Sequence, residues 1–160
     1  MAHHHHHHMS FNIFIASDHT GLTLKKIISE HLKTKQFNVV DLGPNYFDAN
    51  DDYPDFAFLV ADKVKKNSDK DLGILICGTG VGVCMAANKV KGVLAALVVS
   101  EKTAALARQH DNANVLCLSS RFVTDSENIK IVDDFLKANF EGGRHQRRID
   151  KIIRYEKETE

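Results

Sequence analysis

The sequence has few cysteines, no excess of either charge and no long hydrophobic segment. Its three cysteines are odd in number and lack C-x-x-C spacing, so neither a disulfide framework nor a thiolate zinc site is expected. Lys+Arg and Asp+Glu both number 21, and this balance argues against a broad nucleic-acid or anionic-membrane surface. No stretch approaches the roughly 20 apolar residues that cross a bilayer. We therefore expect a soluble, cytoplasmic protein without nucleic-acid or membrane partners.

The chain opens with a segment that we exclude from the fold. Residues 1–8 are Met-Ala followed by six histidines, the pattern of an expression tag, and we take Met9 as the native start. No secretory hydrophobic segment follows Met9. Residues 9–160 have the length of one ordinary domain, and a hydrophobic content of 43% is enough for a packed core. We expect a single domain over 9–160 that ends in a C-terminal helix.

Short apolar runs alternate with helical patterns along this domain. The expected strands are 11–16, 38–41, 72–76, 93–99 and 115–118. Each is followed by a segment with apolar residues at helical spacing, and residues 45–54 form an acidic, turn-rich loop. Strands separated by helices predict right-handed crossovers and a parallel sheet covered on both faces. The expected fold is α/β: a three-layer αβα sandwich around a five-stranded, Rossmann-like parallel sheet.

Ligands of such sheets bind beyond the carboxyl ends of the strands. Asp18 and His19 follow the first strand and Cys77 ends the third. We expect the polar segment 108–112, which precedes the fifth strand, to lie at the same edge. These side chains would then form one site.

Three glycines follow the third strand. Gly78, Gly80 and Gly82 let backbone N–H groups converge on an anion at the start of a helix. A dinucleotide fingerprint needs Gly or Ala at its sixth position, where Val83 stands, although Glu101 lies near the spacing of a ribose-binding acid. No Walker A motif occurs. The alternative is a tight structural turn that binds nothing.

Cys77 opens this loop, and the converging amides would favour a thiolate that acts as nucleophile or proton acceptor. A buried core cysteine is the alternative. His110, in a polar segment, is either a proton-transfer group or simply solvated. Arg144 and Arg148 are four residues apart, so on a helix they share a face and can bind one phosphate, or else pair with nearby acids.

Several segments resemble, in family order, the type B ribose-5-phosphate isomerases, within the sugar-phosphate isomerases that include galactose-6-phosphate isomerases. The I-C-G-T-G-x-G and G-G-R-H motifs are the most specific of them. The matching segments cover almost the whole native chain and are 17–21, 52–55, 73–82, 86–89, 108–110, 120–121 and 141–148.

This resemblance implies an αβα sandwich without metal or organic cofactor, working as a homodimer or a dimer of dimers. It implies interconversion of ribose 5-phosphate and ribulose 5-phosphate, a small sugar-phosphate substrate. Cys77 matches the base that moves a proton between C1 and C2, and His110 matches the residue that opens the furanose ring from the neighbouring subunit. The positions that match substrate contacts are Asp18, His19, Tyr53, Gly78, Thr79, Gly80, Val81, Gly82, Arg121, Arg144 and Arg148.

The sequence departs from the family pattern at one point. The family commonly has His-Asn-Asp after Arg-Gln, whereas this chain has His110-Asp111-Asn112. Asp111 would then make the sugar contact through its backbone or its carboxylate. The alternatives are a galactose-6-phosphate or allose-6-phosphate isomerase, a Cys-His hydrolase, and a non-catalytic phosphate- or nucleotide-binding module.

Overall fold

The computed structural model describes residues 10–159, so the proposed tag at 1–8 lies outside the described residues. Strands and helices alternate, as the sequence predicts. The elements are β1 (Asn12–Ser17), a 3-10 turn (His19–Gly21), α2 (Leu22–Thr34), β2 (Asn38–Asp41), α3 (Tyr53–Lys65), β3 (Leu72–Cys77), α4 (Val81–Ala87), β4 (Ala95–Leu97), α5 (Glu101–Gln109), β5 (Val115–Ser119), α6 (Asp125–Lys137) and α7 (Arg144–Glu158).

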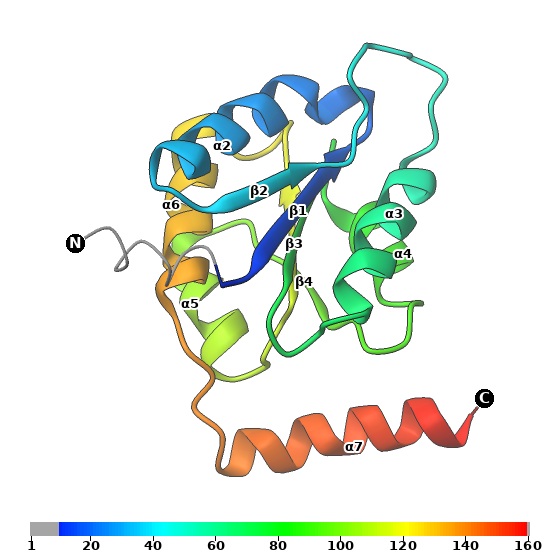
Figure 1. Ribbon diagram of the computed structural model, residues 1–160, viewed down its shortest axis with the longest axis vertical. Coiled ribbons are helices and arrows are strands. Elements are labelled where there is room, and N and C mark those ends of the chain that lie inside the picture. Colours follow the sequence, from blue (N-terminus) through cyan, green and yellow to red (C-terminus); the bar gives the residue numbers. More distant parts are fainter. Residues whose placement is uncertain (1–9, 160) are drawn as a thin grey trace.

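The five strands form one parallel sheet in the order β2-β1-β3-β5-β4. Helices α2, α5 and α6 cover one face, and α3 and α4 cover the other (Figure 1). The predicted three-layer α/β sandwich is therefore confirmed. Among the described residues, no helix is long and apolar enough to span a membrane.

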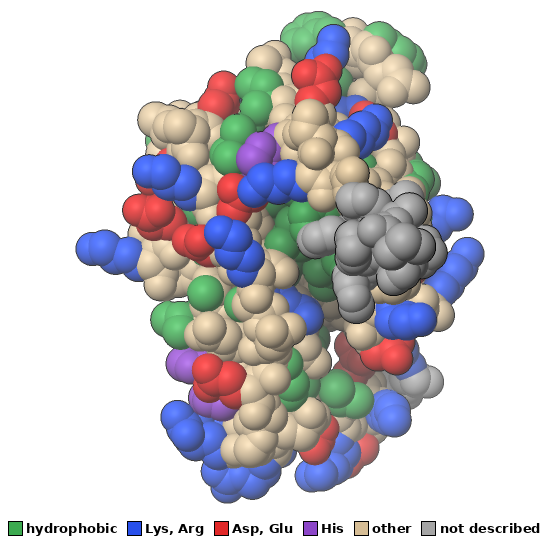
Figure 2. Space-filling model, turned by 60° about the vertical axis from the view of Figure 1, so that its left-hand side comes forward, with side chains coloured by type: hydrophobic (Ala, Val, Ile, Leu, Met, Phe, Trp, Pro, Cys, Tyr) green, Lys and Arg blue, Asp and Glu red, His purple; other side chains and the backbone are tan. Residues whose placement is uncertain are grey.

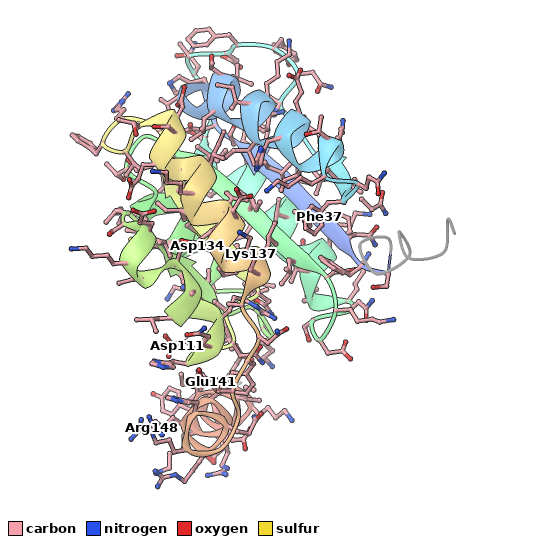
Figure 3. The ribbon with its side chains drawn as sticks, turned by 90° about the vertical axis from the view of Figure 1, so that its left-hand side faces the viewer. Phe37, Asp111, Asp134, Lys137, Glu141 and Arg148 are labelled. Carbon is pink, nitrogen blue, oxygen red and sulfur yellow. The ribbon has the colours of Figure 1, made fainter. Side chains whose placement is uncertain are left out.

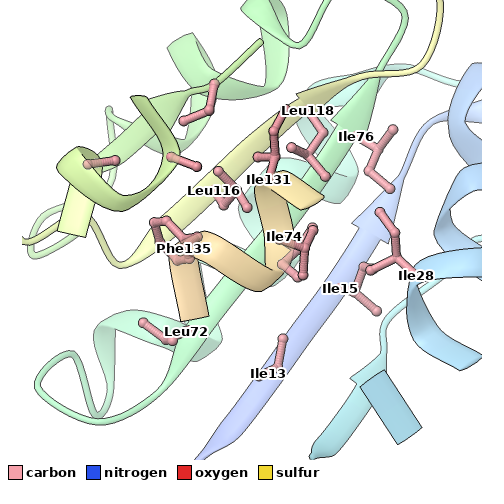
Figure 4. Close-up of a cluster of buried hydrophobic side chains, with 14 of the residues drawn as sticks. Ile13, Ile15, Ile28, Leu72, Ile74, Ile76, Leu116, Leu118, Ile131 and Phe135 are labelled. Atoms are coloured by element: carbon pink, nitrogen blue, oxygen red, sulfur yellow. The ribbon is translucent and has the colours of Figure 1, made fainter. Parts of the chain in front are cut away.

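The core consists of two layers because neighbouring residues of a strand point to opposite faces. Ile74 and Ile76 of β3 pack toward α2 and α6 (Figure 4), whereas Leu75 and Cys77 pack toward α3 and α4. β3 is buried along its whole length, as expected for the central strand of a parallel sheet.

Two element boundaries differ from the prediction. The fourth strand is Ala95–Leu97 rather than 93–99, because β4 is an edge strand and the amide of Leu94 donates to the side chain of Asn114 (2.8 Å) instead of to a neighbouring strand. The loop predicted over 45–54 ends earlier, since α3 begins at Tyr53 with Pro54 in its first turn. Proline fits there because the first amides of a helix have no partner within it.

His31 joins α2 to α6. Its Nε2 lies 2.8 Å from Oδ1 of Asp133, and Nζ of Lys35 lies 3.1 Å from the same oxygen. Burial raises the pKa of Asp133, but the hydrogen bonds from His31 and Lys35 outweigh it, and the net pKa lies below its ordinary value.

We expect Asp133→Asn to lower the free energy of unfolding by about 1 kcal/mol at pH 6 to 7. A carboxylate whose pKa is lowered by folding stabilises the protein above its unfolded-state pKa, and this contribution is lost as the pH falls through the folded-state pKa. The gap between the wild type and Asp133→Asn should therefore persist down to about pH 4 and narrow below that pH in urea-unfolding curves. A gap that stays constant with pH would contradict the assigned ion pair.

The C-terminal helix α7 lies apart from the two helical layers, across the end of the sheet where the strands begin (Figure 1). It buries only His145 and Ile149 and leaves Ile152 and Tyr155 exposed. The amide of Gly92 donates to Glu156 (3.1 Å), which ties the helix to the loop before β4.

Candidate active site

A pocket of about 240 Å³ lies at the carboxyl ends of β1 and β3. It combines one thiol, one imidazole, one phenol and one guanidinium. We call it the Cys77 pocket; its lining residues are Asp18, His19, Thr20, Tyr53, Cys77, Gly78, Thr79, Gly82 and Arg121.

Cys77 is held at the base of the glycine loop. Its side chain is buried, and the amide of Gly80 donates a hydrogen bond to its Sγ (3.2 Å). Gly80 has a φ of 79°, and a Cβ there would lie 2.5 Å from Leu97 Cδ1 and 3.0 Å from the carbonyl of Leu118. Only glycine can make this turn, and the turn is what aims an amide at the sulfur.

The rest of the loop faces the same pocket. Thr79 accepts a hydrogen bond from the amide of the exposed Val81 (3.2 Å), and α4 begins at that residue. A Cβ on Gly82 would lie 2.6 Å from ring atoms of Tyr53, so the glycine lets the phenol pack against the loop. The loop thus brings Tyr53, from α3, to the thiol.

Asp18 and His19 follow β1, as predicted. Asp18 is buried and accepts from the amide of Thr20 (3.0 Å), which caps the short 3-10 turn. His19 Nδ1 lies 2.6 Å from Oδ1 of Asp51, and the ring packs edge-on against Phe47 with centroids 5.6 Å apart. Sequence reasoning missed Asp51, because only folding of the 45–52 loop brings it to His19.

Arg121 lies beside the glycine loop because hydrogen bonds join the end of β5 and the residues after it to that loop. Its amide donates to the carbonyl of Gly78 (3.0 Å), and Ser119 Oγ donates to the same carbonyl (2.8 Å). The Arg121 side chain passes 3.3 Å from where a Cβ on Gly78 would lie. The Arg121 guanidinium therefore lies next to the glycine loop, where it can bind a phosphate.

The segment 108–112 does not lie at this edge, which corrects the expectation of a single edge. α5 returns the chain to the end where β5 starts, and Asn114 accepts from Gly73 (2.8 Å) at the start of β3. Gly73 and Cys77 are four residues apart on that strand, so the two ends of the sheet are separated by roughly 13 Å. A segment that precedes a strand necessarily lies at the strand's amino end.

His110, Asp111, Arg144 and Arg148 therefore stand away from the Cys77 pocket of their own chain. Figure 3 shows Asp111, Glu141 and Arg148 together near α7, at the lower end of the molecule. The ring of His110 is stacked on that of His145, with centroids 4.3 Å apart and planes 8° from parallel. Burial lowers the pKa of His145, and the nearby positive groups add to this effect.

Cys84 and Cys117 lie beside each other. The hydrogen bond with Cys117 lowers the pKa of Cys84 to about 7, while burial raises that of Cys117. Both lie outside the Cys77 pocket. All three cysteines are free thiols.

A family profile described as Ribose/Galactose Isomerase matches residues 13–152. The chain is 67% identical over 150 residues to a Mycoplasma pneumoniae protein described as probable ribose-5-phosphate isomerase B, covering 94% of this chain and 98% of that protein. It is 42% identical to ribose-5-phosphate isomerase B of Mycobacterium tuberculosis H37Rv, covering 92% and 91%.

Solved structures of ribose-5-phosphate isomerase B have a similar fold. Ribose-5-phosphate isomerase B of Clostridium thermocellum superposes with a TM-score of 0.88 at 44% identity, covering 93% of this chain and 99% of that one. The Thermotoga maritima structure has a TM-score of 0.84 at 43% identity, covering 89% and 97%.

Proposed function

The chain belongs to the ribose/galactose isomerase family, and from that premise we propose that it interconverts D-ribose 5-phosphate and D-ribulose 5-phosphate. This is an aldose-ketose isomerisation of the non-oxidative pentose phosphate pathway. The observation that carries the proposal is the Cys77 thiol at a glycine loop, in a pocket that also holds Arg121. We place the reaction in the cytoplasm, because a base made of a free thiol suits a reducing compartment.

In the proposed mechanism, Cys77 acts as the base. As a thiolate it takes the proton from C2 of the open-chain aldose, and the electron pair left on carbon forms an enediolate with the former aldehyde. The hydroxyl proton on O2 passes to O1 and the Cys77 thiol returns its proton to C1, which leaves a hydroxyl on C1 and a ketone at C2. The Gly80 amide already donates to the sulfur, and other amides of the loop from Gly78 to Gly82 would be the donors to an oxyanion.

The other pocket residues orient the sugar. Asp18, His19, Tyr53 and Thr79 supply polar groups around its hydroxyls, with His19 held by Asp51. Arg121 would bind the phosphate at the far end of the chain of carbons. Fixing the reacting carbons near the sulfur supplies much of the acceleration in such reactions.

We propose that the active unit is a homodimer, or a dimer of dimers, in which the partner supplies His110, Asp111, Arg144 and Arg148. Two observations support this. Those residues lie at the opposite end of their own chain from Cys77. Exposed apolar side chains that a partner would cover also lie on α4, in and after β4 and after β5; they are Val81, Met85, Leu97, Val99 and Phe122.

The proposal is tested by incubating the protein with ribose 5-phosphate and following the formation of ribulose 5-phosphate. Galactose 6-phosphate and allose 6-phosphate are assayed in parallel. We expect turnover of the pentose with the higher kcat/KM. Preference for a six-carbon phosphate would overturn the substrate assignment. Nucleotide binding without turnover of any sugar phosphate, or a covalent acyl or phosphoryl adduct on Cys77, would overturn the isomerase.

Arg144→Ala and Arg148→Ala should each raise KM for ribose 5-phosphate by about tenfold or more, with a smaller effect on kcat. The reason is that they are proposed to bind the phosphate, which does not react. Arg147→Ala on the same helix is the matched control, since Arg147 has no assigned contact, and its KM should not change. Steady-state kinetics measure all three, and an unchanged KM in the first two would place the phosphate elsewhere.

A further inference from the structure

The peptide unit between Gly78 and Thr79 is held from one side by residues at the end of β5. Its carbonyl oxygen, that of Gly78, accepts hydrogen bonds from the Ser119 hydroxyl (2.8 Å) and from the Arg121 amide (3.0 Å). We propose that Ser119 is a positioning residue of the isomerase, and that its hydroxyl aims the Thr79 amide into the Cys77 pocket. The inference rests on the proposed function, in which amides of the glycine loop stabilise an oxyanion.

The direction of the Thr79 amide follows from the geometry of a peptide unit. A peptide is planar and trans, so its N–H points opposite to its C=O. β3 lies between β1 and β5 in the sheet, and the Gly78 carbonyl is bound on the β5 side. The Thr79 N–H therefore points toward the β1 side, where Asp18 and His19 line the Cys77 pocket.

The Thr79 amide is also available to a ligand. Thr79 is exposed and lines the pocket, and its N–H makes no hydrogen bond to any other of residues 10–159. The next amide, that of Gly80, is already bound to the Cys77 sulfur. An amide that has a fixed direction and no partner within the chain is suited to a negative oxygen that develops during the reaction.

The Ser119 hydroxyl can donate in one direction only. Its oxygen accepts from the amide of Phe122 (3.1 Å), and its single proton goes to the Gly78 carbonyl. Ser119 is only 1% exposed, so water does not compete for this bond. In the sheet Ser119 is paired with Cys77, so the hydroxyl acts on the peptide one residue beyond the proposed base.

Asn128 holds the main chain of Ser119 from behind. It is fully buried on the inner face of α6, and its Nδ2 donates to the Ser119 carbonyl (2.9 Å). The outer side of the helical layer that contains α6 carries many charged side chains (Figure 2), so the helix separates Asn128 from solvent. Both the main chain and the hydroxyl of Ser119 are therefore fixed before a substrate binds.

Ser119→Ala leaves the Gly78 carbonyl with the Arg121 amide as its remaining donor. The peptide is then free to rotate, and the Thr79 amide meets the oxyanion less well. A donor to an oxyanion acts mainly in the transition state, so its loss lowers kcat and leaves KM nearly unchanged. A change that loosened the phosphate site would raise KM instead.

Steady-state kinetics with ribose 5-phosphate test the effect on the reaction. Ser119→Ala should lower kcat about tenfold or more and keep KM within about twofold of the wild type. Ser119→Thr retains the hydroxyl and should restore most of the lost kcat. Ser29→Ala is the matched control, because it removes another buried serine hydroxyl, on α2 and outside the Cys77 pocket, and its kcat and KM should not change.

Three kinetic results would overturn the positioning role. They are an unchanged kcat in Ser119→Ala, a raised KM at unchanged kcat, and a folded Ser119→Thr that is as slow as Ser119→Ala. Circular dichroism checks that each variant is folded.

A second measurement does not depend on turnover. ¹⁵N relaxation gives the order parameter of the Thr79 amide, which should lie near the rigid value of about 0.85 in the wild type and fall toward about 0.6 in Ser119→Ala. It should stay at the wild-type value in Ser29→Ala. An unchanged order parameter in Ser119→Ala would overturn the proposal. Loss of order at Thr79 together with no turnover by the wild type would support the positioning of the amide and count against the proposed function.

Discussion

Cys77→Ala should lower kcat/KM for ribose 5-phosphate by about 10²–10⁴-fold, because removal of a positioned base eliminates general-base catalysis. The change removes one sulfur atom from a side chain at the base of the glycine loop, so the fold and the binding of sugar phosphate should remain nearly intact. Steady-state kinetics measure kcat/KM. Circular dichroism checks the fold, and calorimetric titration checks the binding of ribose 5-phosphate.

Cys84→Ala is the matched control. Cys84 is a half-buried thiol on α4 whose Sγ donates to the carbonyl of Ala95 (3.5 Å), and it lies outside the Cys77 pocket. Its activity should stay close to that of the wild type. If Cys77→Ala kept more than a few per cent of the activity, the base would have to be another group.

Mixing two inactive variants should restore activity. A heterodimer of Cys77→Ala and His110→Ala has one site with both residues intact and one site with neither. In a random mixture half of the dimers are heterodimers, so about one quarter of the wild-type activity is expected. The physical reason is that Cys77 and His110 lie at opposite ends of the same chain, roughly 13 Å or more apart along β3.

The measurement is best made on co-expressed subunits that carry two different affinity tags, so that purified heterodimers are assayed against each parent homodimer. Recovery in the heterodimer alone supports a site shared between subunits. Proven heterodimers without activity would show that one chain supplies the whole site, and the partner's proposed role would be lost.

Most of the fold follows from local patterns. The alternation of strands with helices was predicted, and the four longer strands to within a residue, because a buried parallel strand is a short apolar run and its covering helices are amphipathic. The fourth strand was overestimated, since Val93 and Val98 are buried by packing while only Ala95–Leu97 pairs with β5.

Site prediction was less complete. The residues after β1 and β3 were correctly expected at one edge, whereas 108–112 was wrongly assigned to it. Asp51 was not predicted, because nothing in its neighbourhood distinguishes it from the other acids of the 45–54 loop. Its contact with His19 spans 32 positions and depends on how the loop folds back.

By itself the sequence determined the order of strands and helices, the glycine loop and the thiol at its start, since these depend on residue types that act over a few positions. Only the tertiary structure decided how the strands are ordered within the sheet, the approach of Asp51 to His19 and the stacking of His110 on His145. Those contacts join segments far apart in the chain, and hydrophobic packing of whole helices on the sheet, rather than any local preference, sets their distance.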